Sequence, residues 1–187
     1  MYKILIIIVV AVLMIAGFLI LNSNEELNVR HSEDNGKAIL LSAPNFSLKD
    51  FNGNTVSLTD FKGKNLIINS WAVWCPFCVK ELKDFSIVQK EFSGQVESDS
   101  KKNNGITIIA INRAESLKVA KEFTDKIGVT DDLIYLLDPS DSFYRSIGAF
   151  SMPETLFVDT NGKIVYHKRG PMPLDEIKER IKSLLND

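Results

Sequence analysis

Hydrophobic and polar positions divide the chain into three parts. The first 21 residues are almost entirely apolar, and Ile4–Leu21 is a run of eighteen residues without a polar side chain. As a helix this run spans roughly 27 Å, close to the hydrocarbon thickness of a bilayer. Residues 22–42 are mostly polar with mixed charge, and a globular pattern begins at Ala43. We therefore expect a membrane anchor at 1–21, a polar tether at 22–42 and one domain at 43–187.

The apolar run fits either a retained anchor or a cleaved signal peptide. The apolar part of a signal peptide is usually about 7–15 residues long and ends at small residues. This run is longer and is followed by Asn22-Ser23-Asn24-Glu25, so an anchor is favoured. Because few charges flank the run, the charge rule barely decides its orientation. A single N-terminal span before a long domain predicts an exported domain on the periplasmic or outer-surface side.

Periodicity after Ala43 alternates between strand-like and helix-like segments. Alternating or short apolar runs predict strands, and periods of three to four residues predict helices. Asn52-Gly53 is typical of a hairpin turn, and Ser116 and Gly128 are typical of a helix start and stop. We expect strands at 45–48, 55–58, 66–70, 106–112, 133–137, 155–158 and 163–167, and helices at 76–92, 116–127, 140–147 and 174–185, with a polar loop at 93–105.

The order of these segments predicts an α/β fold. An N-terminal β-hairpin comes first, strands then alternate with helices, and a second hairpin and a helix end the chain. Alternating strands and helices predict parallel strands at the centre of a sheet with helices on both faces. The closing hairpin adds antiparallel strands. The expected fold is therefore a mixed central sheet flanked by helices.

Composition narrows the function classes. With 45% hydrophobic residues the chain is not disordered. A formal net charge of −2 argues against nucleic acid as a partner, since phosphate binding needs a clustered basic surface. The chain has two cysteines, Cys75 and Cys78, which excludes a framework of several disulfides.

The two cysteines form a C-x-x-C pair between a predicted buried strand and a predicted helix. Cys75 would lie near the helix N-terminus, where free backbone N–H groups and the positive end of the helix dipole stabilise a thiolate. Pro76 fits the first helical turn, because its missing N–H costs little there. Cys78 lies within disulfide reach of Cys75. The first thiol can attack a disulfide, and the second can resolve the mixed intermediate.

Other readings of the pair have weaker support. A zinc site needs two more ligands, and the chain offers only His31 in the tether and His167 in a distant strand. Haem attachment needs a histidine directly after the second cysteine, where Val79 stands. A purely structural disulfide would close a four-residue loop and add little stability. We therefore expect no metal and no cofactor beyond the cysteine pair.

Four segments in this order resemble the thioredoxin superfamily, and within it the membrane-anchored TlpA/ResA-like thiol-disulfide oxidoreductases. They are Pro44-Asn45-Phe46, Leu58 with Phe61-Lys62-Gly63-Lys64, Asn69-Ser70-Trp71-Ala72-Val73-Trp74-Cys75, and Met152-Pro153-Glu154-Thr155-Leu156-Phe157-Val158-Asp159. The resemblance covers roughly Ala43 to Leu185. It implies a thioredoxin-like fold.

The resemblance also implies roles for single residues. Cys75 matches the nucleophile of the family and Cys78 its resolving thiol. Pro153 matches a cis-proline that faces the disulfide and presents the backbone of Met152 to the substrate. Glu81 matches a glutamate that exchanges protons with the thiols, although it could equally be a solvated helical residue. The implied substrate-binding surface consists of Trp74, Pro76, Phe77, Met152 and Pro153.

Two departures from the family leave the direction of electron flow open. Asn69 stands where thioredoxin itself has an ionisable aspartate, which shifts attention to Glu81. The dipeptide Pro76-Phe77 is more similar to glutaredoxins and to oxidising disulfide-forming proteins. Our first hypothesis is a reductase of exported protein disulfides, such as that of apocytochrome c, recharged by a transmembrane electron donor. A disulfide-forming oxidase and a non-catalytic metal-handling module are the alternatives.

Overall fold

A computed structural model describes residues 41–93 and 105–186. The predicted anchor, nearly all of the predicted tether and most of the predicted loop at 93–105 lie outside these residues. Within the described ranges no helix is both long and apolar enough to span a membrane. The chain separates into two compact units, and the second, Leu40–Asp187, contains every described residue.

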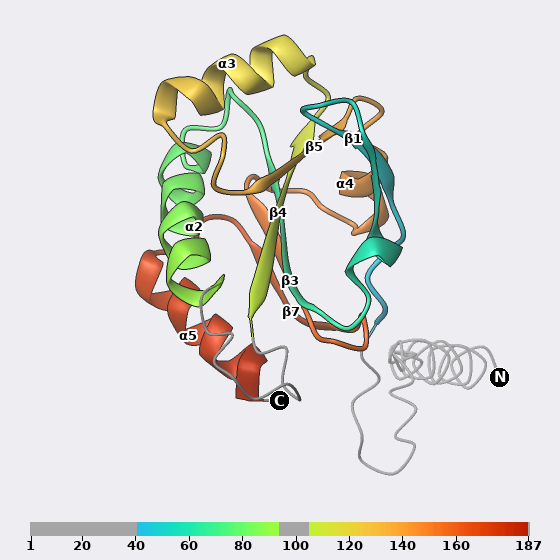
Figure 1. Cartoon of the computed structure of the whole chain (residues 1–187), viewed down its shortest axis with the longest axis vertical. Coiled ribbons are helices and arrows are strands. Elements are labelled where there is room, and N and C mark those ends of the chain that lie inside the picture. Colours follow the sequence, from blue (N-terminus) through green and yellow to red (C-terminus); the bar gives the residue numbers. More distant parts are fainter. Residues whose placement is uncertain (1–40, 94–104, 187) are drawn as a thin grey trace, which may run out of the picture. The chain divides into compact units, whose positions relative to one another are not determined.

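The described residues form one sheet of seven strands in the order β2-β1-β5-β4-β3-β6-β7 (Figure 1). Its centre, β3–β4–β5, is parallel, whereas β1 pairs antiparallel with β2 and β5, and β6 pairs antiparallel with β3 and β7. The predicted mixed sheet is therefore confirmed. The strands are β1 (Ser47–Asp50), β2 (Thr55–Ser57), β3 (Asn65–Trp71), β4 (Ile106–Arg113), β5 (Ile134–Asp138), β6 (Glu154–Val158) and β7 (Ile164–Arg169).

Helices cover both faces of the sheet. Helices α2, α3 and α5 lie on one side of the sheet and α4 lies on the other (Figure 1). The apolar side chains of α2, α3 and α5 pack against one face of the central strands, and those of α4 and the short 3-10 helix η1 pack against the other. The central strand β3 is consequently buried at every position, with Ile67 facing α2 and Ile68 facing α4. The helices are η1 (Leu58–Phe61), α2 (Cys78–Ser93), α3 (Leu117–Ile127), α4 (Ser142–Ser146) and α5 (Leu174–Asn186).

The predicted limits of α3 are confirmed, but those of α2 are not. The Ser116 side chain accepts a hydrogen bond from Val119 N, and Gly128 ends α3 in the left-handed conformation with φ 77°. Helix α2 begins at Cys78, two residues later than predicted. The reason is a tight turn over Pro76 and Phe77, in which Cys78 N donates to the Cys75 carbonyl at 3.2 Å.

Side-chain hydrogen bonds also displace the ends of β1 and α4. Strand β1 covers 47–50 rather than 45–48, because the Asp50 carboxylate accepts from the backbone N–H groups of Asn52 and Asn54 and fixes the turn there. Helix α4 covers only 142–146 of the predicted 140–147. The buried carboxylate of Asp138 accepts from the N–H groups of Ser142 and Phe143 and sets the start of this helix.

Candidate active site

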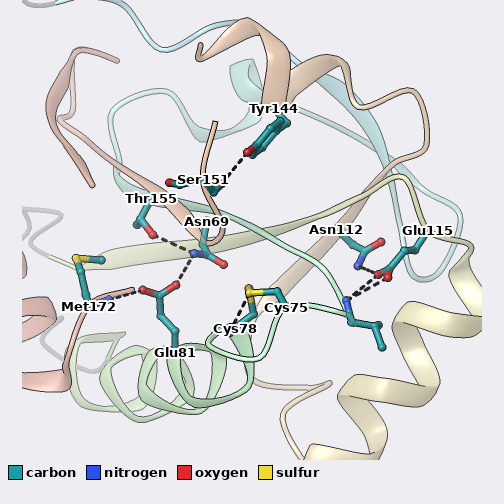
Figure 2. The surroundings of a disulfide bond; sticks show 11 residues. Asn69, Cys75, Cys78, Glu81, Asn112, Glu115, Tyr144, Ser151, Thr155 and Met172 are labelled. Atoms are coloured by element: carbon teal, nitrogen blue, oxygen red, sulfur yellow. Dashed lines mark hydrogen bonds between the residues drawn. A yellow bond between two sulfur atoms is a disulfide. The ribbon is translucent and has the colours of Figure 1, made fainter. Parts of the chain in front are cut away.

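The cysteine pair lies where β3 leads into α2, at the carboxyl end of the central strands. Cys75 and Cys78 form a disulfide with 5.4 Å between their Cα atoms (Figure 2). Both cysteines are buried, at 1% and 0% exposure, but Trp74 and Phe77 beside them are 62% and 58% exposed. The disulfide therefore lies beneath a rim of exposed aromatic side chains.

A backbone N–H group points at the first sulfur. Cys78 N donates to Cys75 Sγ at 3.2 Å, from the first residue of α2. A helix N-terminus has unpaired N–H groups and a partial positive charge, which both favour a thiolate at this sulfur after reduction. Although α2 begins later than predicted, Cys75 still lies next to its N-terminus.

The loop before β6 contributes Met152 to the apolar surroundings of the disulfide. The Met152–Pro153 peptide bond is cis, as the family resemblance implies. Met152 packs against the apolar cluster that contains both cysteines, and Gly170 N donates to the Pro153 carbonyl at 2.9 Å. The structure thus brings Met152, the residue before Pro153, into one cluster with the cysteine pair, although Cys78 lies 74 residues earlier in the sequence.

Glu81 lies inside the protein, one turn of α2 after Cys78. It is 2% exposed, so the alternative of a solvated helical glutamate is wrong. Its Oε1 accepts from Met172 N and its Oε2 accepts from Asn69 Nδ2, both at 2.9 Å (Figure 2). Burial raises the pKa of Glu81 from 4.5 to about 7, against the opposing effect of these two hydrogen bonds. A carboxyl with this pKa can both hold and release a proton near neutral pH.

Asn69 connects Glu81 to β6, the strand that follows the cis-proline. Its Nδ2 donates to Glu81 Oε2 and to Thr155 Oγ1, each at 2.9 Å. Thr155 follows Glu154, the residue next to Pro153. The departure from an ionisable aspartate at position 69 thus leaves a neutral side chain that fixes the Glu81 carboxyl in place.

Sequence reasoning missed Glu115, which holds the loop before the disulfide. Its Oε2 accepts hydrogen bonds from Val73 N at 3.0 Å and from Asn112 Nδ2 at 2.6 Å (Figure 2). Since Glu115 comes two residues after the end of β4, its position at the carboxyl end of a parallel strand was a signal that could have identified it.

Glu154 stands in a segment that resembles the family, and it organises the loop before the cis-proline. This fully buried carboxylate accepts from the backbone N–H groups of Phe150 and Ser151 through Oε1. Its Oε2 lies 2.6 Å from His167 Nε2 on β7. No local pattern predicts this contact, because His167 comes from the neighbouring strand.

The two tryptophans have different environments. Trp71 is fully buried and packs against Phe123 and Tyr135 at ring-centroid distances of 5.8 and 5.9 Å, as a core residue does. Trp74, by contrast, is exposed next to Cys75. Within the described part of the chain, no cluster of three or more histidine, cysteine or acidic side chains could hold a metal ion.

Comparison with known proteins supports the same chemistry. The family model described as Redoxin matches residues 41–184. The chain is 28% identical to the thiol-disulfide oxidoreductase ResA of Geobacillus thermodenitrificans over 153 residues, 82% of each chain. It is 32% identical to the ResA of Bacillus subtilis over 130 residues, which are 70% of this chain and 66% of that protein.

A solved structure has the same fold. The crystal structure of a putative thiol:disulfide interchange protein DsbE from Chlorobium tepidum superposes with a TM-score of 0.68. The match covers 79% of this chain and 98% of that one, at 24% identity. The match shows the thioredoxin-like α/β fold.

Proposed function

Because the chain belongs to the redoxin family, within the thioredoxin superfamily and similar to ResA, we propose that it is a membrane-anchored, extracytoplasmic reductase of protein disulfides. That it is a thiol-disulfide oxidoreductase follows from the family and its named relatives. The direction of electron flow, the anchor, the substrate and the electron donor are the proposed parts.

The proposed reaction is a two-step exchange of thiolates. The Cys75 thiolate attacks one sulfur of the substrate disulfide, expels the other sulfur as a thiolate and forms a mixed disulfide. The Cys78 thiolate then attacks Cys75 Sγ, releases the second substrate thiolate and re-forms the Cys75–Cys78 disulfide. The substrate gains two electrons and two protons. Glu81, with its pKa near neutrality, exchanges a proton with the cysteine pair during this cycle.

The environment of Cys75 Sγ is the observation that carries the reductase direction. A strongly oxidising pair needs a strongly stabilised thiolate, because its reduced form must be favoured. Among the described residues, one hydrogen bond reaches Cys75 Sγ, and its donor is the neutral backbone N–H of Cys78. No lysine, arginine or histidine side chain of this part of the protein donates to the sulfur. With this N–H group as the donor, we expect the Cys75 thiolate to be stabilised less strongly than an oxidising pair requires, which supports a reducing pair.

A tether at the membrane would serve this reaction. A reductase outside the cytoplasm must be re-reduced after each turnover, and we propose a transmembrane protein as its electron donor. An anchor at 1–21 followed by a polar segment at 22–42 would keep the domain near that donor. The family resemblance makes apocytochrome c the first substrate to test, with other exported proteins that carry disulfides as further candidates.

A single-turnover assay tests this proposal. The full chain, kept in detergent and pre-reduced, is mixed with a peptide that contains one disulfide, and both redox states are followed after acid quenching. We expect peptide thiols to appear as the Cys75–Cys78 disulfide forms. The Cys75→Ser variant should be inactive. Reduced wild-type protein that leaves the peptide oxidised would contradict the proposal.

The oxidase alternative rests on Pro76-Phe77, because the residues between the cysteines alter hydrogen bonding to the thiolate. The same assay run in reverse distinguishes it. If the disulfide form of the protein oxidises a reduced peptide faster than the reduced form reduces an oxidised one, the oxidase is favoured.

A further inference from the structure

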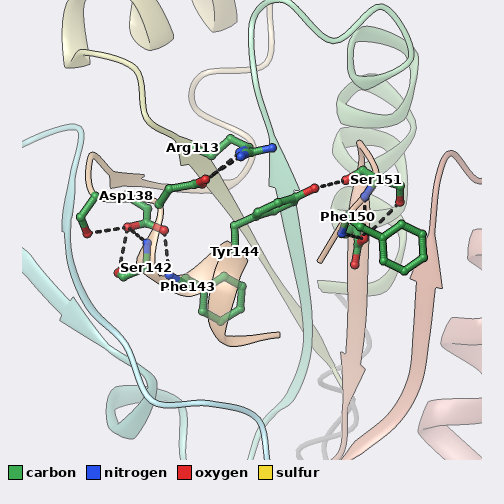
Figure 3. Close-up of polar contacts among 10 residues, drawn as sticks. Arg113, Asp138, Ser142, Phe143, Tyr144, Phe150 and Ser151 are labelled. Atoms are coloured by element: carbon green, nitrogen blue, oxygen red, sulfur yellow. Dashed lines mark hydrogen bonds and ion pairs between the residues drawn. The ribbon is translucent and has the colours of Figure 1, made fainter. Parts of the chain in front are cut away.

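The backbone just before the cis-proline is fixed by buried groups. Glu154 Oε1 accepts from Phe150 N at 2.8 Å and from Ser151 N at 3.0 Å. On the other side, the Tyr144 hydroxyl donates to the Ser151 carbonyl at 2.7 Å (Figure 3). Tyr144 is itself covered by the guanidinium of Arg113, whose Cζ lies 3.6 Å from the centre of the ring. The position of Phe150 is therefore set by the core.

This fixed backbone presents an exposed aromatic side chain. Phe150 is 76% exposed, more than any other large hydrophobic residue of the described ranges. Exposed apolar surface beside a reactive site is typical of a binding surface. Because the hydrogen bonds of Phe150 and Ser151 hold the loop, a ligand that covers this ring would not have to order the backbone first.

Arg169 lies over the Phe150 ring, and its charge is not paired with an acidic side chain of the described residues. Its Cζ is 5.0 Å from the ring centre. Among the described residues Arg169 forms no salt bridge, whereas the adjacent Lys168 pairs with Glu176 at 2.8 Å. A guanidinium that packs on an aromatic ring still has N–H donors at its edge, which match the geometry of a carboxylate.

The register of the sheet places this pair beside the cis-proline. Arg169 is the partner of Glu154 in the antiparallel β6–β7 ladder, and Gly170 N donates to the Pro153 carbonyl. Phe150 precedes Pro153 by three residues. Arg169 lies on β7, the strand next to β6. A polypeptide that pairs with the backbone at the cis-proline would therefore lie next to the strand end that carries Arg169.

We propose that Phe150 and Arg169 form a specificity site that selects protein segments with an apolar side chain and a carboxylate near the reacting cysteine. This inference rests on the proposed function, since it assumes a polypeptide disulfide as substrate. The apolar side chain packs on Phe150, and the carboxylate pairs with Arg169. The enzyme thereby prefers cysteines flanked by aspartate or glutamate over those flanked by lysine.

Two disulfide peptides that differ at one residue test the site. One carries glutamate two residues from its cysteine and the other carries glutamine, and kcat/KM is measured with the full chain in detergent. An exposed ion pair predicts about a two- to fivefold preference for the glutamate peptide at low salt. Salt near 1 M should abolish the preference, because it screens the charge.

Variants of Arg169 distinguish a role in substrate recognition from a purely structural role. Arg169→Gln should bring the ratio of the two rates to about one, and Arg169→Glu should invert the preference in favour of a peptide with lysine at that position. Lys62→Gln is the matched control, since Lys62 lies before the amino end of β3, at the opposite end of that strand from the cysteines. It should keep the wild-type ratio.

The outcomes distinguish this inference from the proposed function. If wild-type protein reduces neither peptide, the proposed function fails. If it reduces both at equal rates, or if Arg169→Gln slows both in the same proportion and so keeps the ratio, the specificity site is refuted and the reductase stands. Inversion by Arg169→Glu would support the site, because a merely structural arginine would not reverse the preference.

Discussion

The Glu81→Gln variant tests whether the buried carboxyl beside the disulfide is held protonated. Burial moves the pKa of Glu81 from 4.5 to about 7. Between these values the unfolded chain loses this proton while the folded chain keeps it. Glu81 therefore makes the folded protein less stable as pH rises through this range, and the full loss of about 3 kcal/mol is reached above pH 7.

Comparison of the variant with the wild type isolates this contribution. The other ionisable groups are the same in both proteins, so their contributions cancel in the difference. The free energy of unfolding of Glu81→Gln minus that of the wild type should become more positive by about 3 kcal/mol between about pH 4 and about pH 8. The difference becomes more positive because the wild type loses stability over this pH range. The glutamine side chain has no such proton to lose.

Urea denaturation of the oxidised full chain in detergent at both pH values, followed by tryptophan fluorescence, gives this difference. Glu122→Gln on α3 is the matched control, because Glu122 is 67% exposed and should show no such change. A Glu81→Gln difference that stays within about 0.5 kcal/mol across the pH range would refute the reasoning. It would mean that Glu81 titrates alike in the folded and unfolded states.

Three further predictions follow from the packing and the chemistry of the site. The Cys78→Ala variant should accumulate a mixed disulfide between Cys75 and its substrate, visible by non-reducing electrophoresis and mass spectrometry. If only free substrate is found, the role of Cys75 as the attacking thiol is contradicted. Glu154→Ala should lower the free energy of unfolding by about 1–3 kcal/mol and raise KM more than it lowers kcat, because the N–H groups of Phe150 and Ser151 lose their partner. Phe85→Ala should cost about 3–5 kcal/mol in urea denaturation, whereas an effect under about 1 kcal/mol would contradict its place in the core.

Elements that depend on local pattern were predictable from the sequence. The apolar runs of β3 and β4 identify strands buried on both faces, and Ser116 with Gly128 identifies the ends of α3. The cysteine spacing identifies the redox pair. In each case the physical cause lies within a few neighbouring residues, so a short window of sequence contains it.

Features that depend on long-range contacts were not predictable in this way. The burial of Glu81 depends on Met172 and Asn69, which are 91 and 12 residues away. The anchoring of the cis-proline loop by Glu154 and His167 depends on the pairing of β6 with β7. Periodicity carries no information about such partners.

The reduction potential of the Cys75–Cys78 couple tests the central claim most directly. It is measured by equilibrating the full chain with glutathione or dithiothreitol buffers and counting free thiols. A reductase with a moderately stabilised Cys75 thiolate should have a potential close to that of thioredoxin, about −270 mV. A potential near −120 mV, roughly that of a strongly oxidising pair, would contradict the account.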